Sequence, residues 1–197
     1  MRFNCHPRAN LFRYFVCVIL VFGEASCLGQ VEAYFPDKVF WEWKDATLGQ
    51  EYSKSLRSLQ EPSLWQVSKT QETPTYRFLL MPEAREIHGA PRSVRLDIQA
   101  DGTSIITTRE GGHKSKVRTL TFEQTRAFLD LVEKGGFWNL PSAESDPGPD
   151  GRMWVIEGVR NKQYHVVERW SPRGDIHQLG AMLMRNLAGM KVSRHEL

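Results

Sequence analysis

Two strand-like runs near the end of the chain place the strongest constraint on its fold. Residues 153–159 and 164–170 are rich in β-branched and aromatic side chains, and only the four polar residues 160–163 separate them. A connection this short joins antiparallel neighbours, because a parallel crossover needs about a dozen residues or more. The sequence therefore predicts a β-hairpin in which Val159 pairs with Tyr164 across the turn.

Further strands and helices are predicted around this hairpin. Thr121 and Gln124 form a capping-box pattern at the start of one helix, and Asp175 is expected to cap the last helix. We expect an α+β domain with an antiparallel sheet and helices packed on one face, preceded by an N-terminal helical arm. Apolar runs and alternating patterns predict strands at 76–81, 93–99, 104–108 and 116–120, and helical spacing predicts helices near 46–60, 121–134 and 175–189.

Length and composition agree with one folded domain. The chain has 197 residues, of which 41% are hydrophobic and 25% charged, and these values are ordinary for a globular protein. They exclude a disordered, collagen-like or multi-pass membrane protein. We divide the chain into a signal peptide at 1–27, an arm with an amphipathic helix and a linker at 28–72, and an α+β domain at 73–197.

The first 27 residues have the organisation of a secretory signal. Three arginines precede an apolar run at residues 14–22, and small residues then offer cleavage sites between residues 25 and 30. This run is too short to cross a bilayer, which takes about 20 apolar residues. We expect a secreted or periplasmic protein that meets the membrane only through its signal. Lipid attachment at Cys27 is the alternative.

Charge and motif content exclude several functional classes. The chain holds 26 Lys and Arg against 23 Asp and Glu, and the first 27 residues account for three of the bases and one of the acids. The remainder is nearly neutral, which argues against a nucleic-acid partner. No cofactor is indicated, since nucleotide-binding and common hydrolase motifs are missing from the sequence. No metal site is indicated either, because His165 and Glu168 point to opposite faces of a strand.

The hairpin carries a pattern that resembles a group of uncharacterised exported bacterial proteins. That pattern reads D-G-x-x-W-x-x-E-G and then Y-H-x-V-x-R-W-S-P, and the likeness extends over residues 75–190. The resemblance implies bacterial export and a single domain, and it implies no activity. The matching residues are Asp150, Gly151, Trp154, Glu157, Gly158, Tyr164, His165, Val167, Arg169, Trp170, Ser171 and Pro172.

Two groups of ionisable residues are candidates for a functional site. The first comes from the hairpin and the start of the next helix, where acid/base or anion-binding groups can line one end of the sheet. Its members are Glu157, His165, Arg169 and Asp175. The second is a basic cluster around two glycines, suited to a phosphate or an anionic polymer. Its members are Arg109, His113, Lys114 and Lys116.

These observations favour an exported, non-catalytic binding module of the cell envelope or secretome, whose partner is a protein or an envelope component. The alternative is a small hydrolase or transferase with acid/base residues on the C-terminal hairpin. The alternative requires Glu157, His165 and Arg169 to lie on one face, within reach of one substrate.

Overall fold

The computed structural model describes residues 33–40, 47–82, 89–111, 115–144 and 151–192. The predicted signal at residues 1–27, with Cys27, lies outside the described residues, as do His113 and Lys114 of the basic cluster. The described residues all belong to one compact unit, Glu32–Leu197.

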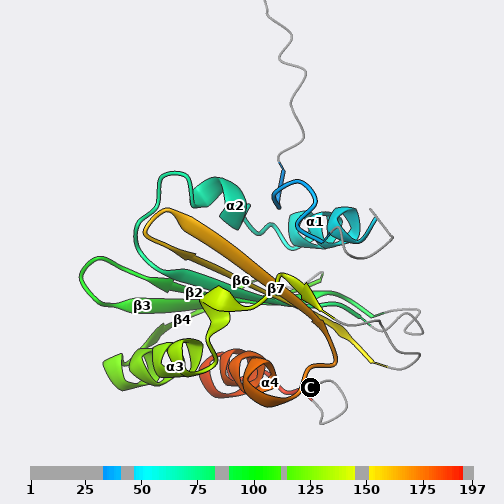
Figure 1. Ribbon diagram of the computed structural model, residues 1–197. Coiled ribbons are helices and arrows are strands. Elements are labelled where there is room, and N and C mark those ends of the chain that lie inside the picture. The colour runs from blue at the N-terminus through cyan, green and yellow to red at the C-terminus, as the bar shows by residue number, and fades with distance from the viewer. Residues whose placement is uncertain (1–32, 41–46, 83–88, 112–114, 145–150, 193–197) are drawn as a thin grey trace, which may run out of the picture. The chain divides into compact units, whose positions relative to one another are not determined.

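Seven strands form one sheet in the order β4-β3-β2-β1-β6-β7-β5 (Figure 1). The six longer strands pair antiparallel throughout, and the two-residue strand β5 runs parallel to β7. Connections of two to five residues join β2 to β3, β3 to β4 and β6 to β7, which is possible because these pairs are antiparallel. The strands are β1 (Thr75–Leu80), β2 (Arg92–Ile98), β3 (Ser104–Glu110), β4 (Lys116–Leu120), β5 (Ala143–Glu144), β6 (Met153–Arg160) and β7 (Gln163–Trp170).

The predicted hairpin is confirmed as β6 and β7, including its register. Val159 lies opposite Tyr164, and Trp154 lies opposite Arg169. Because successive side chains alternate between the faces of a strand, this register decides which residues share a face.

Helices cover the face of the sheet that carries Trp154. Helix α3 (Phe122–Lys134) and helix α4 (Gly174–Ala181), which continues as η2 (Met182–Leu187), lie side by side beneath it (Figure 1). The α+β architecture with an antiparallel sheet is as expected. The main core on this face contains Tyr76, Phe78, Val94, Leu96, Phe128, Val132, Phe137, Trp154, Ile156, Val167, Leu179 and Leu183.

The two helix starts differ from each other in how well the sequence predicted them. The capping box of α3 is confirmed, with the Thr121 hydroxyl accepting from the Gln124 amide at 3.2 Å. The prediction that Asp175 caps α4 is wrong. The N-cap is Arg173, so Asp175 lies in the first turn, where a negative charge suits the positive end of the helix.

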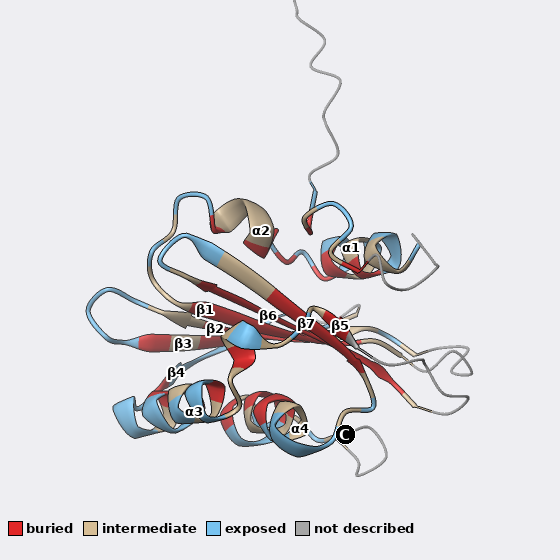
Figure 2. Ribbon diagram, in the orientation of Figure 1, coloured by how far each residue is buried: buried red, intermediate tan, exposed pale blue. Residues whose placement is uncertain are grey.

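The opposite face of the sheet is covered by the described part of the N-terminal segment. Helix α1 (Leu48–Ser58) and helix α2 (Leu64–Val67) lie above it, with their buried residues facing the strands (Figure 2). A second core forms here from Tyr34, Phe35, Phe40, Tyr52, Leu56, Leu59, Leu79, Met153, Val155 and Val166. The hairpin is therefore buried on both of its faces.

Candidate functional site

The candidate acid and base of the hairpin do not meet. His165 and Arg169 lie on the face that α3 and α4 cover, together with Trp154. Glu157 lies opposite Val166, on the face that α1 and α2 cover. Because the sheet separates them, Glu157 and His165 cannot reach one substrate. The predicted convergence of Glu157, His165 and Arg169 is therefore wrong.

Glu157 is held by an arginine from β1. Its carboxylate accepts from Arg77 Nε at 2.7 Å, and both side chains are 0% exposed. The Tyr164 hydroxyl donates to the other carboxylate oxygen at 2.9 Å. Burial raises the pKa of Glu157, whereas Arg77 and Tyr164 lower it. The Glu157 carboxylate thus belongs to a buried ion pair that stabilises the sheet.

A second carboxylate extends this pair into a buried ion cluster, which we define as Glu61, Arg77, Arg95, Arg109 and Glu157. Glu61 follows α1 and is itself fully buried. It accepts from Arg95 at 2.6 Å and lies 3.1 Å from Arg109 Nε. Its distance to Arg77 Nη1 is 3.6 Å. The cluster fastens the segment after α1 to β1, β2 and β3.

Sequence reasoning missed Arg77 and Glu61, although one signal was available. The run of residues 75–80 has one charged residue, Arg77, among mostly apolar neighbours, and every residue in it is buried. A buried charge needs a partner of opposite sign. Arg77 in this pattern therefore predicts a buried acid, but the acid's position in the sequence cannot be derived from local spacing.

His165 and Arg169 are also held by contacts within the fold. The His165 ring packs edge-on against Phe137, with 5.1 Å between the ring centroids. Burial lowers the pKa of His165, although backbone carbonyls raise it. Arg169 donates to the Pro141 carbonyl at 2.9 Å and to the Glu168 carbonyl at 2.7 Å. These contacts fix the chain that leads from α3 to β5.

Asp175, the fourth member of the hairpin group, lies against the end of α3. A Cβ atom on Gly135 would approach the Asp175 Cβ to 3.1 Å. Asp175 thus packs where α3 ends and α4 begins, and Glu157 on the other face is out of its reach.

Glu168 is a buried acid that the candidate groups did not include. It is on the face that α1 covers, and one of its carboxylate oxygens accepts from the Tyr52 hydroxyl. The other oxygen is buried and has no hydrogen-bond partner in the structure as described. Burial raises the pKa of Glu168, while Tyr52 and Arg169 lower it. Glu168 links α1 to the centre of the hairpin.

Packing also accounts for the small residues of the hairpin pattern. A Cβ atom on Gly158 would lie 2.7 Å from Phe137 and 3.2 Å from Trp138, so glycine lets these rings rest on the sheet. The Ser171 hydroxyl accepts from the Arg152 amide at 3.0 Å and closes the open end of the hairpin. The recognisable pattern therefore serves the fold in the described part of the chain.

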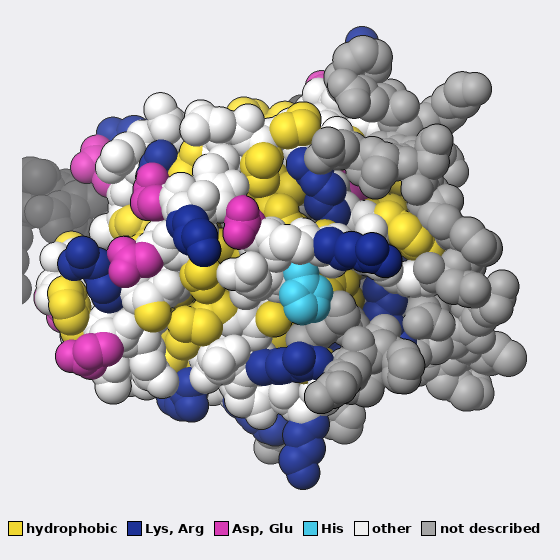
Figure 3. Space-filling model, turned by 60° about the horizontal axis from the view of Figure 1, so that its bottom comes forward, with side chains coloured by type: hydrophobic (Ala, Val, Ile, Leu, Met, Phe, Trp, Pro, Cys, Tyr) yellow, Lys and Arg dark blue, Asp and Glu magenta, His cyan; other side chains and the backbone are white. Residues whose placement is uncertain are grey.

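A small pocket adjoins this closing segment. It has a volume of about 400 Å³ and is lined by Arg169, Ser171, Arg173 and Ile176, among others. The start of α4 lies here. Among the charged side chains in the right half of the view in Figure 3, Lys and Arg predominate, whereas the left half mixes Lys and Arg with Asp and Glu. Arg169 is engaged with Pro141, so its guanidinium braces the wall of this pocket.

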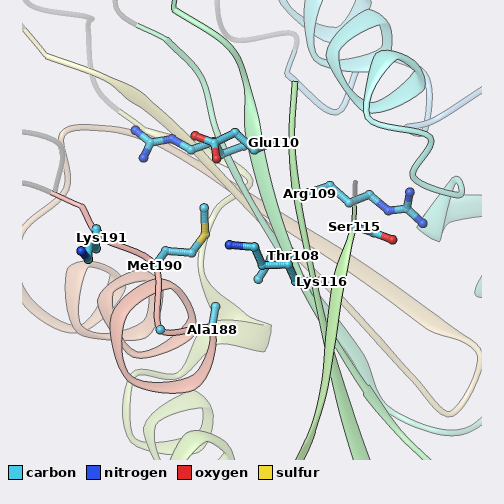
Figure 4. Close-up of a pocket in the computed structure, with 10 residues that line it drawn as sticks. Thr108, Arg109, Glu110, Ser115, Lys116, Ala188, Met190 and Lys191 are labelled. Carbon is cyan, nitrogen blue, oxygen red and sulfur yellow. The ribbon is translucent and has the colours of Figure 1, made fainter. Parts of the chain in front are cut away.

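A larger pocket opens where the ends of β2, β3 and β4 meet the residues after η2 (Figure 4). Its volume is about 610 Å³, and its walls include Thr108, Lys116, Met190 and Lys191. The side chains of Lys116 and Met190 point toward one another across it (Figure 4). We call it the β4 pocket. Residues 188–191 were not predicted to contribute to a site, because they lie far from β4 in the sequence.

The β4 pocket has a basic character. Lys116 and Lys191 are exposed, and no described acid forms an ion pair with either. Glu110 is the acidic residue in its lining and lies opposite Arg92 across β2 and β3. Lysines that form no ion pair with a described acid are available to an anionic group.

The predicted basic cluster is only partly brought together. Lys116 lies opposite Thr108 and points into the β4 pocket. The Arg109 side chain points away from the pocket, toward Glu61 (Figure 4). Adjacent residues of a strand face opposite ways, so Arg109 and Lys116 cannot share a ligand. The inclusion of Arg109 in the cluster is therefore wrong.

No group of three potential metal-binding residues occurs in the described part of the chain. Within the same residues, no helix combines the length and apolar character needed to cross a bilayer. No protein-family model matches the chain, and no curated protein matches it.

Proposed function

We propose that the protein is an exported bacterial binding module of the cell envelope or secretome, that it is non-catalytic, and that it contacts its partner through the β4 pocket. The observation that carries this proposal is a contrast between two sets of ionisable residues. Glu157, Glu168 and Arg169 of the hairpin are buried and engaged within the fold, whereas Lys116 and Lys191 are exposed beside the β4 pocket.

The hairpin supports a binding function because it offers no assembled chemistry. General acid/base catalysis needs groups within hydrogen-bond reach of one substrate. Glu157 is paired with Arg77 on one face, while His165 packs on Phe137 on the other. The two side chains stabilise the sheet from opposite sides.

Export is supported by the sequence of the first 27 residues and by the resemblance of the hairpin to exported bacterial proteins. Expression of the full chain in a bacterial host tests it directly. The mass of the periplasmic or secreted product should place the new N-terminus between residues 25 and 30. A full-length product retained in the cytoplasm would contradict export.

Site-specific crosslinking tests the binding surface. A photo-reactive residue replaces Lys116 or Lys191 in the full chain, and the exporting cells are irradiated. Both positions should give discrete adducts of higher mass. The matched control replaces Lys54, an exposed lysine on α1 at the opposite face of the sheet. Equal crosslinking from Lys54 would contradict a specific site at the β4 pocket.

Catalytic assays test the remaining part of the proposal. The processed protein should not turn over ester, peptide, glycoside or phosphoester substrates. Turnover that the substitution Glu157→Gln abolishes in a still-folded protein would overturn the non-catalytic assignment.

A further inference from the structure

Strand β4 forms one edge of the sheet, next to the β4 pocket. It pairs with β3 on one side, and no described strand pairs with its outer edge. Its first four residues, Lys116–Thr119, are exposed on the surface, and only Leu120 is buried. An edge strand of this kind presents backbone groups that can pair with another extended segment.

The side chains of β4 alternate between basic residues on one face of the sheet and uncharged residues on the other. Lys116 and Arg118 point to the face that carries the pocket, and Val117 and Thr119 point to the other face. Val117 is 64% exposed, and Phe122, just beyond the strand, is 69% exposed. These two are the large hydrophobic residues with exposed side chains in the described part of the chain. Apolar side chains exposed beside a sheet edge favour an interaction surface.

The charges on β4 decide between a second copy and a different partner. Two copies can pair antiparallel about Val117, Arg118 or Thr119 while keeping their helices on the same face. The first register places Lys116 opposite Arg118 of the other copy, and the second, which overlaps the whole of β4, places Arg118 opposite itself. The third avoids like charges but pairs only Arg118–Leu120 of the strand and leaves Lys116 outside the pairing. Like charges directly opposite each other disfavour strand pairing. The edge therefore selects a partner with acidic side chains at alternating positions.

We infer that the outer edge of β4 binds an extended protein segment in which acidic residues alternate with apolar or β-branched residues. The acidic side chains lie beside Lys116 and Arg118, and one of them reaches the mouth of the β4 pocket. The apolar side chains cover Val117. Arg118 also donates to the Leu187 carbonyl, which holds its guanidinium on the pocket side of the strand. This inference rests on the proposed binding function and names its partner.

Peptide binding to the exported protein, after its signal peptide has been removed, tests the inference. Fluorescence anisotropy follows a labelled peptide of alternating Glu and Val, and a matched peptide carries Lys in place of each Glu. We expect the acidic peptide to bind about ten-fold more tightly than the basic one. The substitution Lys116→Glu should reverse this preference. The control Lys54→Glu changes net charge equally on the opposite face and should leave it intact.

Three results would overturn the inference. One is equal affinity for the two peptides, and another is an unchanged preference in the Lys116→Glu protein. The third is a wild-type dimer, seen by sedimentation, that Val117→Asp converts to monomer, because the occupant would then be a second copy. Crosslinking at Lys116 distinguishes a failure of this inference from a failure of the proposed binding function. If adducts form there but neither peptide binds, the binding function stands and the acidic strand is refuted.

Discussion

The buried pair of Arg77 and Glu157 gives the sharpest test of how this fold is held together. The substitution Glu157→Gln preserves side-chain size but removes the negative charge. It leaves the Arg77 guanidinium buried, 0% exposed, with Glu61 3.6 Å away as its remaining acid. We expect the protein to fold with a reduced free energy of unfolding, because a buried cation would lose its closest counter-charge.

The size of this loss follows from what Arg77 retains. Removing one partner of a buried ion pair typically costs 3–5 kcal/mol, because a charge stays buried without compensation. Arg77 keeps its hydrogen bond to the Pro62 carbonyl at 2.6 Å and its approach to Glu61. The lower end of the range, about 3 kcal/mol, is therefore expected. For a domain of this size that corresponds to a fall in Tm of about 6–12 °C.

Urea denaturation of the protein without its signal peptide, and of its variants, measures this loss. The matched control is Glu72→Gln, since Glu72 pairs with Lys162 at 2.9 Å on the surface, with side chains 71% and 54% exposed. An exposed pair contributes about 0–1 kcal/mol, so the control should change little.

A double variant completes the test. Arg77→Met together with Glu157→Gln removes both charges, and it should lose less stability than the sum of the two single variants. The reasoning is refuted if Glu157→Gln costs no more than Glu72→Gln, or if the single effects simply add. Either result would mean that the Arg77 and Glu157 charges make no coupled contribution to the free energy of unfolding.

Three further predictions concern other buried contacts. Burial raises the pKa of Glu168 above its ordinary value of 4.5, so the folded protein holds that proton more tightly. The free energy of unfolding should therefore fall as pH rises from 4.5 through the folded pKa, and Glu168→Gln should reduce that fall in urea titrations across pH. Burial lowers the pKa of His165 below 6.5, so the folded protein binds that proton less tightly than the unfolded chain. The stability that neutral His165 contributes should therefore be lost as pH falls from 6.5 through the folded pKa. His165→Gln should flatten this part of the same profile, and an unchanged slope would contradict the assignment. Gly180→Ala drives a Cβ into the Trp154 ring and should destabilise by about 1–2 kcal/mol, which near-UV circular dichroism and denaturation can follow.

Local sequence patterns predicted the parts of the fold that depend on near neighbours. The four-residue connection and the alternating runs beside it predicted the hairpin and its register, because a short turn leaves few ways to pair two strands. That register placed Glu157 and His165 on opposite faces before their surroundings were known. The capping box of α3 was predictable for the same reason, since its two hydrogen bonds join Thr121 and Gln124, three residues apart.

The candidate site was less predictable, because its members come from distant segments. The hypothesis that grouped Glu157 with His165 and Arg169 placed them at one end of the sheet, and it required one face to present all three, which the register of the hairpin does not allow. Arg109 was grouped with Lys116 by proximity in sequence, but strand alternation sends Arg109 to Glu61.

The sequence by itself determined that the chain forms an α+β domain with an antiparallel sheet, because strand and helix periods are local properties. Only the tertiary structure decided that β1 lies between β2 and β6, which brings Arg77 to Glu157, 80 residues away in the chain. It also decided that residues 188–191 complete the β4 pocket. Which distant residues come into contact depends on how whole faces pack, and no short stretch of sequence carries that information.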